Sequence, residues 1–164
     1  MATSTPTIET AMAHLKTQLA TISVASGYRT DVKKVTRILK SMEEEATNMP
    51  CLTIVFGREE MMKYTNREIK STFTLVIYGY VVFEGETGGD DKNAQQLLIK
   101  LTADVKEKLS AIFTADRFDS TTENFHITSI ETDEGLIEPY SAFRMECAME
   151  LSYKAEDSGV VVAI

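Results

Sequence analysis

Apolar residues recur at helical spacing in two segments of the chain. Over residues 6–24 they step by three and four positions along one stripe: Ile8, Met12, Leu15, Leu19 and Ile22. Over residues 92–114 a second stripe contains Leu97, Leu98, Leu101, Val105, Leu109, Ile112 and Phe113. Thr5 can cap the first segment and Gly27 can end it. The spacing therefore predicts two amphipathic helices, each with one face toward a core.

Four other segments have the composition or the alternation of β-strands, namely residues 51–57, 72–84, 125–132 and 142–153. Residues 72–84 are apolar on both faces, which predicts a central strand that is covered on both sides. Gly79 in its middle indicates a bulge or a close backbone approach. Residues 142–153 alternate strictly between apolar and more polar positions, so we expect one buried face and one wetter face.

Three segments are less clearly patterned. Residues 26–39 are read as a loop followed by a short strand or a helical turn, and residues 42–50 as an acidic loop closed by Pro50. Residues 58–70 have mixed charge and no clean period, so they form either a long loop or an extension of a hairpin.

The order of these elements predicts an α+β fold with two layers. We expect a roughly four-stranded, mainly antiparallel sheet with the two amphipathic helices packed on one face. The length of 164 residues predicts one domain over residues 1–164. Residues 1–5 and 155–164 are expected to be flexible or interface-forming tails.

The balance of charge narrows the class of function. The formal net charge is −8, which disfavours a freestanding nucleic-acid binder, because such proteins carry a basic surface. An acidic surface can still face DNA if its task is to let the duplex slide past. No apolar run is long enough for a membrane span, and the first seven residues lack the pattern of a signal peptide, so we expect a protein made in the cytoplasm.

The residue types that usually carry chemistry are scattered. Cys51 and Cys147 lie in strand patterns and are expected to be buried reduced thiols. His14 and His126 have no second histidine at metal-binding spacing. The glycine-rich residues 85–91 lack the ending of a phosphate-binding loop and carry two acids where the anion would lie. We expect no enzyme, no catalytic residue, no metal and no cofactor.

Two groups of acidic residues stand out, the run Glu43, Glu44 and Glu45 and the pair Asp133 and Glu134. The run is either a solvated loop or an acidic surface that lines a channel. The pair precedes Gly135, which favours a turn over a cation site because no further ligands follow at fixed spacing.

Two groups of apolar residues are candidates for contact with other proteins. Met61, Met62 and Tyr64 lie in an otherwise polar segment, where they either pack onto the core or form an adaptable interface. Val160, Val161, Val162 and Ile164 end the chain, where they either add a strand to a neighbour or fray.

The order and character of the segments resemble those of a known family. After the first helix come SGYRTDVKKV, MPCLTIVFG, a polar loop, TFTLVIYGYVV, the helix LLIKLTADVKEKLSAI and the closing TDEGLIEPYSAFRMECAMELSY. Over residues 8–153 this resembles the tail terminator proteins, also called tail completion or minor tail proteins, of tailed bacteriophages. The segments GYRTDV and TDEGLIEPY carry most of the resemblance.

The resemblance implies a structural virion protein. Members form a hexameric ring that caps the head-proximal end of the tail tube, stops its growth and offers a surface to the head connector. DNA passes through the ring without specific binding, and a contractile tail would add the sheath protein as a partner. The candidate acids would then line the lumen. Two alternatives stay open: another neck or head–tail joining protein, and an unrelated small cytoplasmic enzyme or ligand-binding domain.

Overall fold

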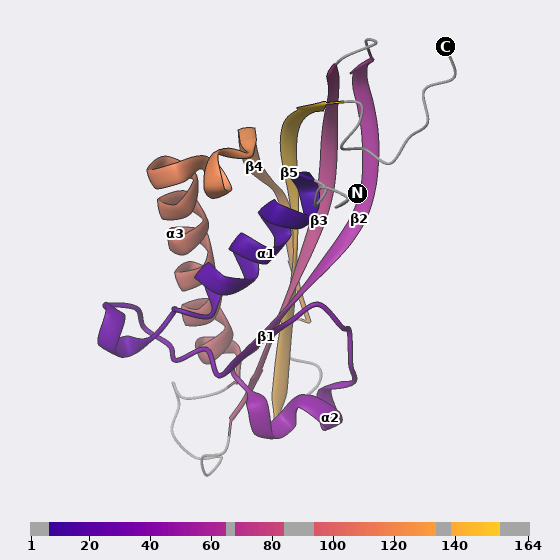
Figure 1. Cartoon of the computed structure of the whole chain (residues 1–164). Coiled ribbons are helices and arrows are strands. Elements are labelled where there is room, and N and C mark those ends of the chain that lie inside the picture. The colour runs from indigo at the N-terminus through magenta and orange to yellow at the C-terminus, as the bar shows by residue number, and fades with distance from the viewer. Residues whose placement is uncertain (1–6, 65–67, 84–93, 134–138, 155–164) are drawn as a thin grey trace, which may run out of the picture.

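The computed structural model describes residues 7–64, 68–83, 94–133 and 139–154, and it has an α+β fold (Figure 1). Its α-helices are α1 (Thr7–Leu19), α2 (Met42–Glu45) and α3 (Ala94–Ser120), and two 3-10 helices are η1 (Val24–Ser26) and η2 (Ala46–Asn48). The strands are β1 (Lys34–Thr36), β2 (Cys51–Tyr64), β3 (Glu68–Val82), β4 (Thr122–Thr132) and β5 (Tyr140–Lys154).

The strands form one mixed sheet in the order β1-β2-β3-β5-β4. β1 runs parallel to β2, while the β2–β3, β3–β5 and β4–β5 pairs are antiparallel. The predicted fold class is confirmed, with five described strands where about four were expected. The additional strand is β1, which contains only three residues and so leaves little trace in a periodicity pattern.

The main core lies between one face of the sheet and the helices α1 and α3, which cross that face in Figure 1. β5 presents its predicted apolar face to this core, and the buried members are Phe143, Met145, Cys147, Met149 and Leu151. Gly79 faces the same layer, and a Cβ atom there would lie 2.2 Å from the ring of Phe143. Of the two explanations predicted for Gly79, a close approach is therefore the correct one, because the pairing of β3 with β5 continues through this residue without a shift.

On the opposite face of the sheet, the described residues cover one end. Met49, Cys51 and Tyr80 form a second cluster there, against which Met42 and Tyr140 pack. The covering elements are α2 and η2, so the prediction of a loop over residues 42–50 is wrong. Ser41 starts α2 through a reciprocal capping box with Glu44, which satisfies backbone donors that a four-residue helix would otherwise leave free.

Two further boundaries differ from the prediction. α1 ends at Leu19, and Gly27, with a φ of 92°, caps the short helix η1 instead. α3 continues past residue 114, and Arg117, Phe118 and Asp119 then turn the chain through left-handed backbone angles into β4. Phe118 is fully buried against Phe113 and Phe125, and this packing holds an otherwise unfavourable turn in place.

Residues 58–70 were predicted from the sequence as a long loop or a hairpin extension, and the described residues 58–64 and 68–70 continue the β2–β3 pairing. Pairing is described from Cys51 opposite Tyr80 to Tyr64 opposite Ile69, with register shifts at residues 56–58 and 61–63. In Figure 1 the end of β2 and the start of β3 project beyond the helical layer. The hairpin therefore has a base, residues 51–54 of β2, and an outer half, residues 55–64 of β2.

Candidate assembly surfaces

The segment GYRTDV is held against α3 by a buried carboxylate. Asp104 is 0% exposed, and its two oxygens accept hydrogen bonds from the backbone N–H of Arg29 at 3.1 and 2.9 Å. The Nη1 atom of Arg29 also donates to Asp104 at 2.8 Å, and the hydroxyl of Thr30 donates at 2.7 Å. Three donors thus make four hydrogen bonds to one side chain, which explains why the segment has a defined shape.

The remaining residues of this segment are also bonded. Asp31 accepts a hydrogen bond from the backbone N–H of Val24 at 2.8 Å, and Arg29 makes a second ion pair with Glu107 at 3.0 Å. The ammonium of Lys108 lies 5.9 Å from the centre of the Tyr28 ring. The polar residues of GYRTDV therefore fix a loop, and no converging set of free polar groups is left for chemistry among them.

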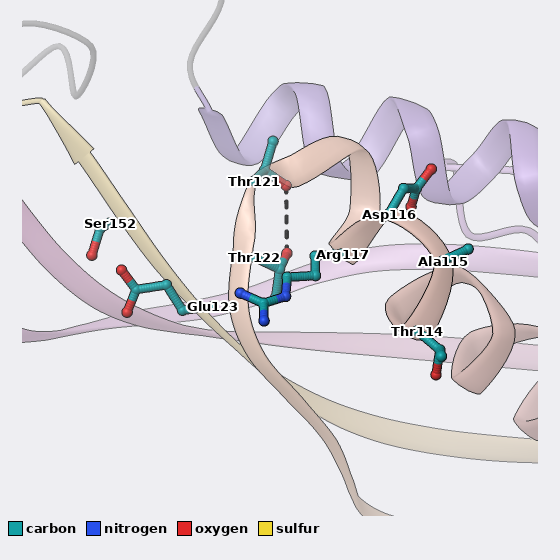
Figure 2. A pocket seen from close by; sticks show the side chains of 8 residues that line it. All are labelled: Thr114, Ala115, Asp116, Arg117, Thr121, Thr122, Glu123 and Ser152. Carbon is teal, nitrogen blue, oxygen red and sulfur yellow. Dashed lines mark hydrogen bonds between the residues drawn. The ribbon is translucent and has the colours of Figure 1, made fainter.

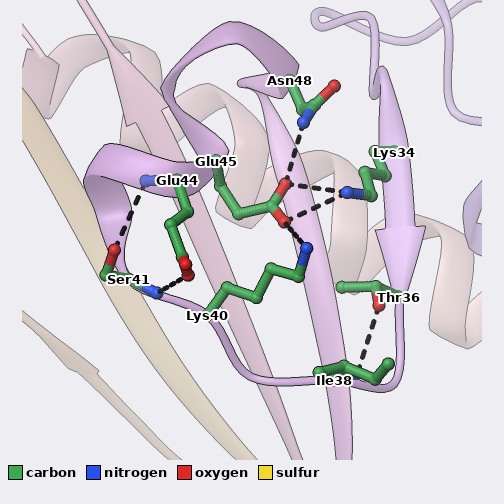
Figure 3. A network of polar contacts seen from close by, with 8 residues as sticks. All are labelled: Lys34, Thr36, Ile38, Lys40, Ser41, Glu44, Glu45 and Asn48. Atoms are coloured by element: carbon green, nitrogen blue, oxygen red, sulfur yellow. Dashed lines mark hydrogen bonds and ion pairs between the residues drawn. The ribbon is translucent and has the colours of Figure 1, made fainter.

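The acidic run at residues 43–45 divides between solvent and interior (Figure 3). Glu43 and Glu44 are exposed, whereas Glu45 is 1% exposed. The Glu45 carboxylate accepts hydrogen bonds from Lys34 Nζ at 3.1 and 3.2 Å and from Asn48 at 3.1 Å. Burial by itself raises the pKa of Glu45, but the hydrogen bonds from Lys34 and Asn48 outweigh it and leave this pKa below its ordinary value.

The second acidic group lies at the same end of the sheet. Asp133 follows β4, and its Oδ1 atom accepts a hydrogen bond from the hydroxyl of Ser141 at 2.6 Å. The register places the end of β4, the start of β5 and the start of β2 at one level, and α2 leads directly into β2. Glu134 lies outside the described residues. The structure thus brings Asp133 to the end where Glu43 and Glu44 are exposed.

The candidate contact residues lie toward the other end. Met61 is 52% exposed on the outer half of the β2–β3 hairpin. Met62 and Tyr64 belong to the same strand by their backbone. Val160, Val161, Val162 and Ile164 lie outside the described residues. The last described residue before them, Lys154, pairs with Glu68 beside the hairpin tip.

Several exposed apolar residues were not predicted to be surface residues. Phe56 is 44% exposed on β2, and Ile38, Leu39 and Ile99 are exposed as well. Phe56 belongs to the strand predicted over residues 51–57, and it lies where the exposed stretch of β2 begins. Ile38 and Leu39 follow β1 in a loop.

In the described part of the chain, the two cysteine thiols are buried and His14 lies beside a carboxylate. Burial raises the pKa of the Cys51 and Cys147 thiols to about 12. His14 Nε2 lies 3.2 Å from the Asp116 carboxylate. No group of three or more metal-ligating side chains is found among these residues, and none of the described helices has the length and apolar character needed to cross a membrane.

A shallow polar hollow lies at the turn from α3 to β4 (Figure 2). Two of its charged residues have partners, since Glu123 pairs with Lys70 at 2.6 Å and Asp116 with His14. The hydroxyls of Thr121 and Thr122 lie 3.4 Å apart within hydrogen-bonding range of each other. The hollow is therefore a polar surface depression in which both acidic side chains are already paired.

Together, the fold and these surfaces define a small α+β protein whose described exposed acidic and apolar side chains lie on strands, loops and helices. A model of the Bacteriophage Tail Tube Terminator Protein family matches residues 1–160. The chain belongs to this family, so the resemblance predicted from its segments is confirmed. Membership implies association with phage tail components and a place in the virion tail. No curated protein matches the chain.

Proposed function

We propose that the chain forms a hexameric ring that caps the head-proximal end of the tail tube. The ring ends tube polymerisation, joins the tail to the head connector and lets DNA pass through its lumen. The observation that carries this proposal is the family match over residues 1–160. The protein acts as a structural part and not as an enzyme, assembles in the host cytoplasm, and meets the sheath as a further partner if the tail is contractile.

Head-to-tail association of identical subunits is the way in which this ring would close. In a heterologous interface each subunit uses one patch to bind a different patch on its neighbour, and a suitable rotation closes the set. The described sheet has two different outer strands, β4 on one side and β2 with the short β1 on the other. Strand edges present backbone groups that can pair with another chain, which makes them natural contact surfaces.

The acidic residues are proposed to ease passage of DNA. Glu43 and Glu44 are exposed, and Asp133 lies at the same end of the sheet. A negative surface there would repel the phosphate backbone and prevent the duplex from binding to the wall. Glu45, with its carboxylate bound by Lys34, contributes mainly to holding α2, and Glu134 is retained as a lumen candidate from the sequence.

The contact residues are proposed to lie at the hairpin end. Met61, with its neighbours Met62 and Tyr64, and the terminal residues Val160, Val161, Val162 and Ile164 would meet a neighbouring subunit or the tube protein. Deleting residues 159–164 should weaken ring formation or tube capping. Unchanged assembly of the shortened chain would remove the terminal residues from this proposal.

Negative-stain electron microscopy tests the proposed function. The purified protein is imaged alone and mixed with its tail tube protein. We expect rings with sixfold views, or caps on tube ends together with tubes of limited length. Tubes that grow unchecked without caps would contradict the proposal, and binding to head adaptor protein alone would indicate a different neck component.

A further inference from the structure

Two long strand edges of the subunit are open in the part of the chain that the structure describes. Beyond Thr53, where pairing with β1 stops, no described strand pairs with the outer side of β2. β4 is the last strand on the other side of the sheet, and it pairs only with β5 among the described residues. Each edge is 11 residues long, over 54–64 in β2 and 122–132 in β4.

The directions of β2 and β4 allow the two edges to pair as antiparallel strands. β2 is antiparallel to β3, β3 is antiparallel to β5, and β5 is antiparallel to β4. β2 and β4 therefore run in opposite directions. Rotating a copy about an axis roughly along the strands brings its β4 beside β2 of the first copy, again antiparallel. The new pairing would repeat the hydrogen-bond pattern that already joins the long strands within the subunit.

The register across the sheet also places residues of the two edges at the same height along the strands. Following the register across the sheet, Arg58 lies level with Thr74, Ala148 and His126. Phe56 likewise lies level with Leu75, Cys147 and Ile127. A copy joined at the same height would therefore place the outer half of β2 beside the first half of β4, clear of the part of β2 that β1 occupies.

The side chains on the two edges have matching faces. Phe56 shares the helix-side face with its partner Leu75, and Ile130 shares that face with its partner Met145. Phe56 is 44% exposed and Ile130 is 36% exposed, so each edge leaves a large apolar side chain half open on the same face of the sheet. Joining the edges would continue the apolar layer from one subunit to the next and cover both.

We propose that β4 of one subunit pairs antiparallel with the outer half of β2 of the next copy of this chain, so that the sheets continue around the assembly. This inference rests on the proposed ring and names the strands that close it. If the rotation between neighbouring subunits closes the ring, sheets that are joined head to tail leave no free edge. Each subunit contributes a different edge to each contact, as a ring requires.

Disulfide trapping tests this pairing. Arg58→Cys on β2 is combined in turn with Asn124→Cys, His126→Cys or Ser129→Cys on β4. All three β4 positions share the sheet face of Arg58, and together they cover the level alignment and one step to either side. Within one subunit β2 and β4 are separated by two strands, about 14 Å, which is beyond the reach of a disulfide of about 7 Å. Every trapped bond therefore joins two copies.

The full-length variants are mildly oxidised and run on non-reducing gels. We expect at least one pair to give a ladder that ends in a closed covalent ring, while each single cysteine gives none. Arg58→Cys with Ile99→Cys serves as a matched control, because Ile99 is 69% exposed on α3, away from the β4 edge. The buried native thiols stay unreactive.

The outcomes separate this pairing from the ring itself. Rings visible by microscopy without any β2–β4 ladder would overturn the pairing and leave the proposed function standing. Dimers from Arg58→Cys alone would overturn it as well, because they would show β2 meeting β2. Absence of rings and tube caps in the unsubstituted protein would instead overturn the proposed function.

Discussion

The base and the outer half of β2 differ sharply although they belong to one strand. At the base, Cys51, Leu52, Thr53 and Ile54 are all almost fully buried. In the outer half, residues 56–61 are all exposed, although their partners on β3 include buried residues. The base is covered on one face by the core under α1 and α3 and on the other by α2 and η2. The base of β2 therefore serves stability, and under the proposed function its outer half is left for contact with partners.

This comparison separates two kinds of substitution. Changes in the covered part of the molecule should lower the free energy of unfolding of the subunit. Changes in the outer half should leave that free energy nearly unchanged and act on assembly.

The largest loss is expected from Asp104→Ala. It removes the buried acceptor for the backbone N–H and the guanidinium of Arg29 and for the buried hydroxyl of Thr30. We expect the free energy of unfolding to fall by about 3 kcal/mol. Urea denaturation followed by circular dichroism measures it. Glu107→Gln is the matched control, because Glu107 bonds the same Arg29 from an exposed position and should cost about 0.5 kcal/mol at most. Equal losses from Asp104→Ala and Glu107→Gln would contradict the view that the buried carboxylate of Asp104 holds the segment GYRTDV against α3.

Gly79→Ala should come next. The added Cβ would lie 2.2 Å from the Phe143 ring, which must then move within a closely packed core. Overpacking of this kind costs about 1–3 kcal/mol. In a double-mutant cycle with Phe143→Leu, the two losses should be less than additive, because the smaller side chain makes room. Strict additivity would show that the ring does not limit this position.

Glu45→Gln should have a smaller effect that depends on pH. It weakens the bonds with Lys34 and Asn48 under α2, with an expected loss of about 1–2 kcal/mol near neutral pH. Because the folded pKa of Glu45 is lowered, its contribution is fully present above the ordinary glutamate pKa of about 4.3. The contribution is lost as pH falls through the lower folded value. Thermal unfolding at pH 7 and pH 3 should therefore show a smaller gap between the two proteins at pH 3.

The control for this pH effect is an ion pair nearer the hairpin tip. Glu123 pairs with Lys70 across the sheet at 2.6 Å, but both side chains are well exposed to solvent. Glu123→Gln should therefore change the free energy of unfolding by only about 0–0.5 kcal/mol. A loss as large as that of Glu45→Gln would mean that an exposed ion pair between β3 and β4 contributes to stability as much as the buried carboxylate of Glu45 does.

The smallest effect on unfolding is expected from Phe56→Ser, since this side chain is already half exposed. The subunit should change by about 0.5 kcal/mol or less. Ring formation, measured by analytical ultracentrifugation over a range of concentrations, should weaken if Phe56 becomes covered by a neighbour. Ile99→Ser on α3 should change neither quantity. If Phe56→Ser caused a large loss of subunit stability and left assembly unchanged, the outer half of β2 would serve stability and not contact with a neighbour.

The elements that periodicity predicts are those with long, regular patterns. The stripes of α1 and α3 and the alternation of Phe143 to Leu151 in β5 were predicted, and the structure places them on the main core. For residues 26–39 the sequence left a short strand and a helical turn open, and the structure has the short strand β1. The choice depends on pairing with Cys51–Thr53, a contact between distant segments over only three residues. The interior position of Glu45 was missed because a run of three acids is typical of a solvated surface.

The candidate surfaces were predictable in part. The outer half of β2 carries Met61 in a polar context, which is visible in the sequence. The strand order that makes β2 and β4 the long outer edges depends on how β5 inserts between β3 and β4. Neither local propensity nor alternation contains that information, because the two residues of a cross-strand pair can be far apart in the chain.

The bulge at Gly57 has a consequence for how such a subunit can diversify. With its extra residue in β2, Phe56 and Glu59 share one face of the sheet although an odd number of positions separates them. The bulge therefore decides which side chains of the outer half of β2 lie on each face of the sheet, independently of the alternation in the buried base. An insertion or deletion between residues 57 and 64 can be absorbed there without turning Leu52 and Ile54 out of the core. The tip can therefore vary in length to fit different partners while the scaffold stays the same.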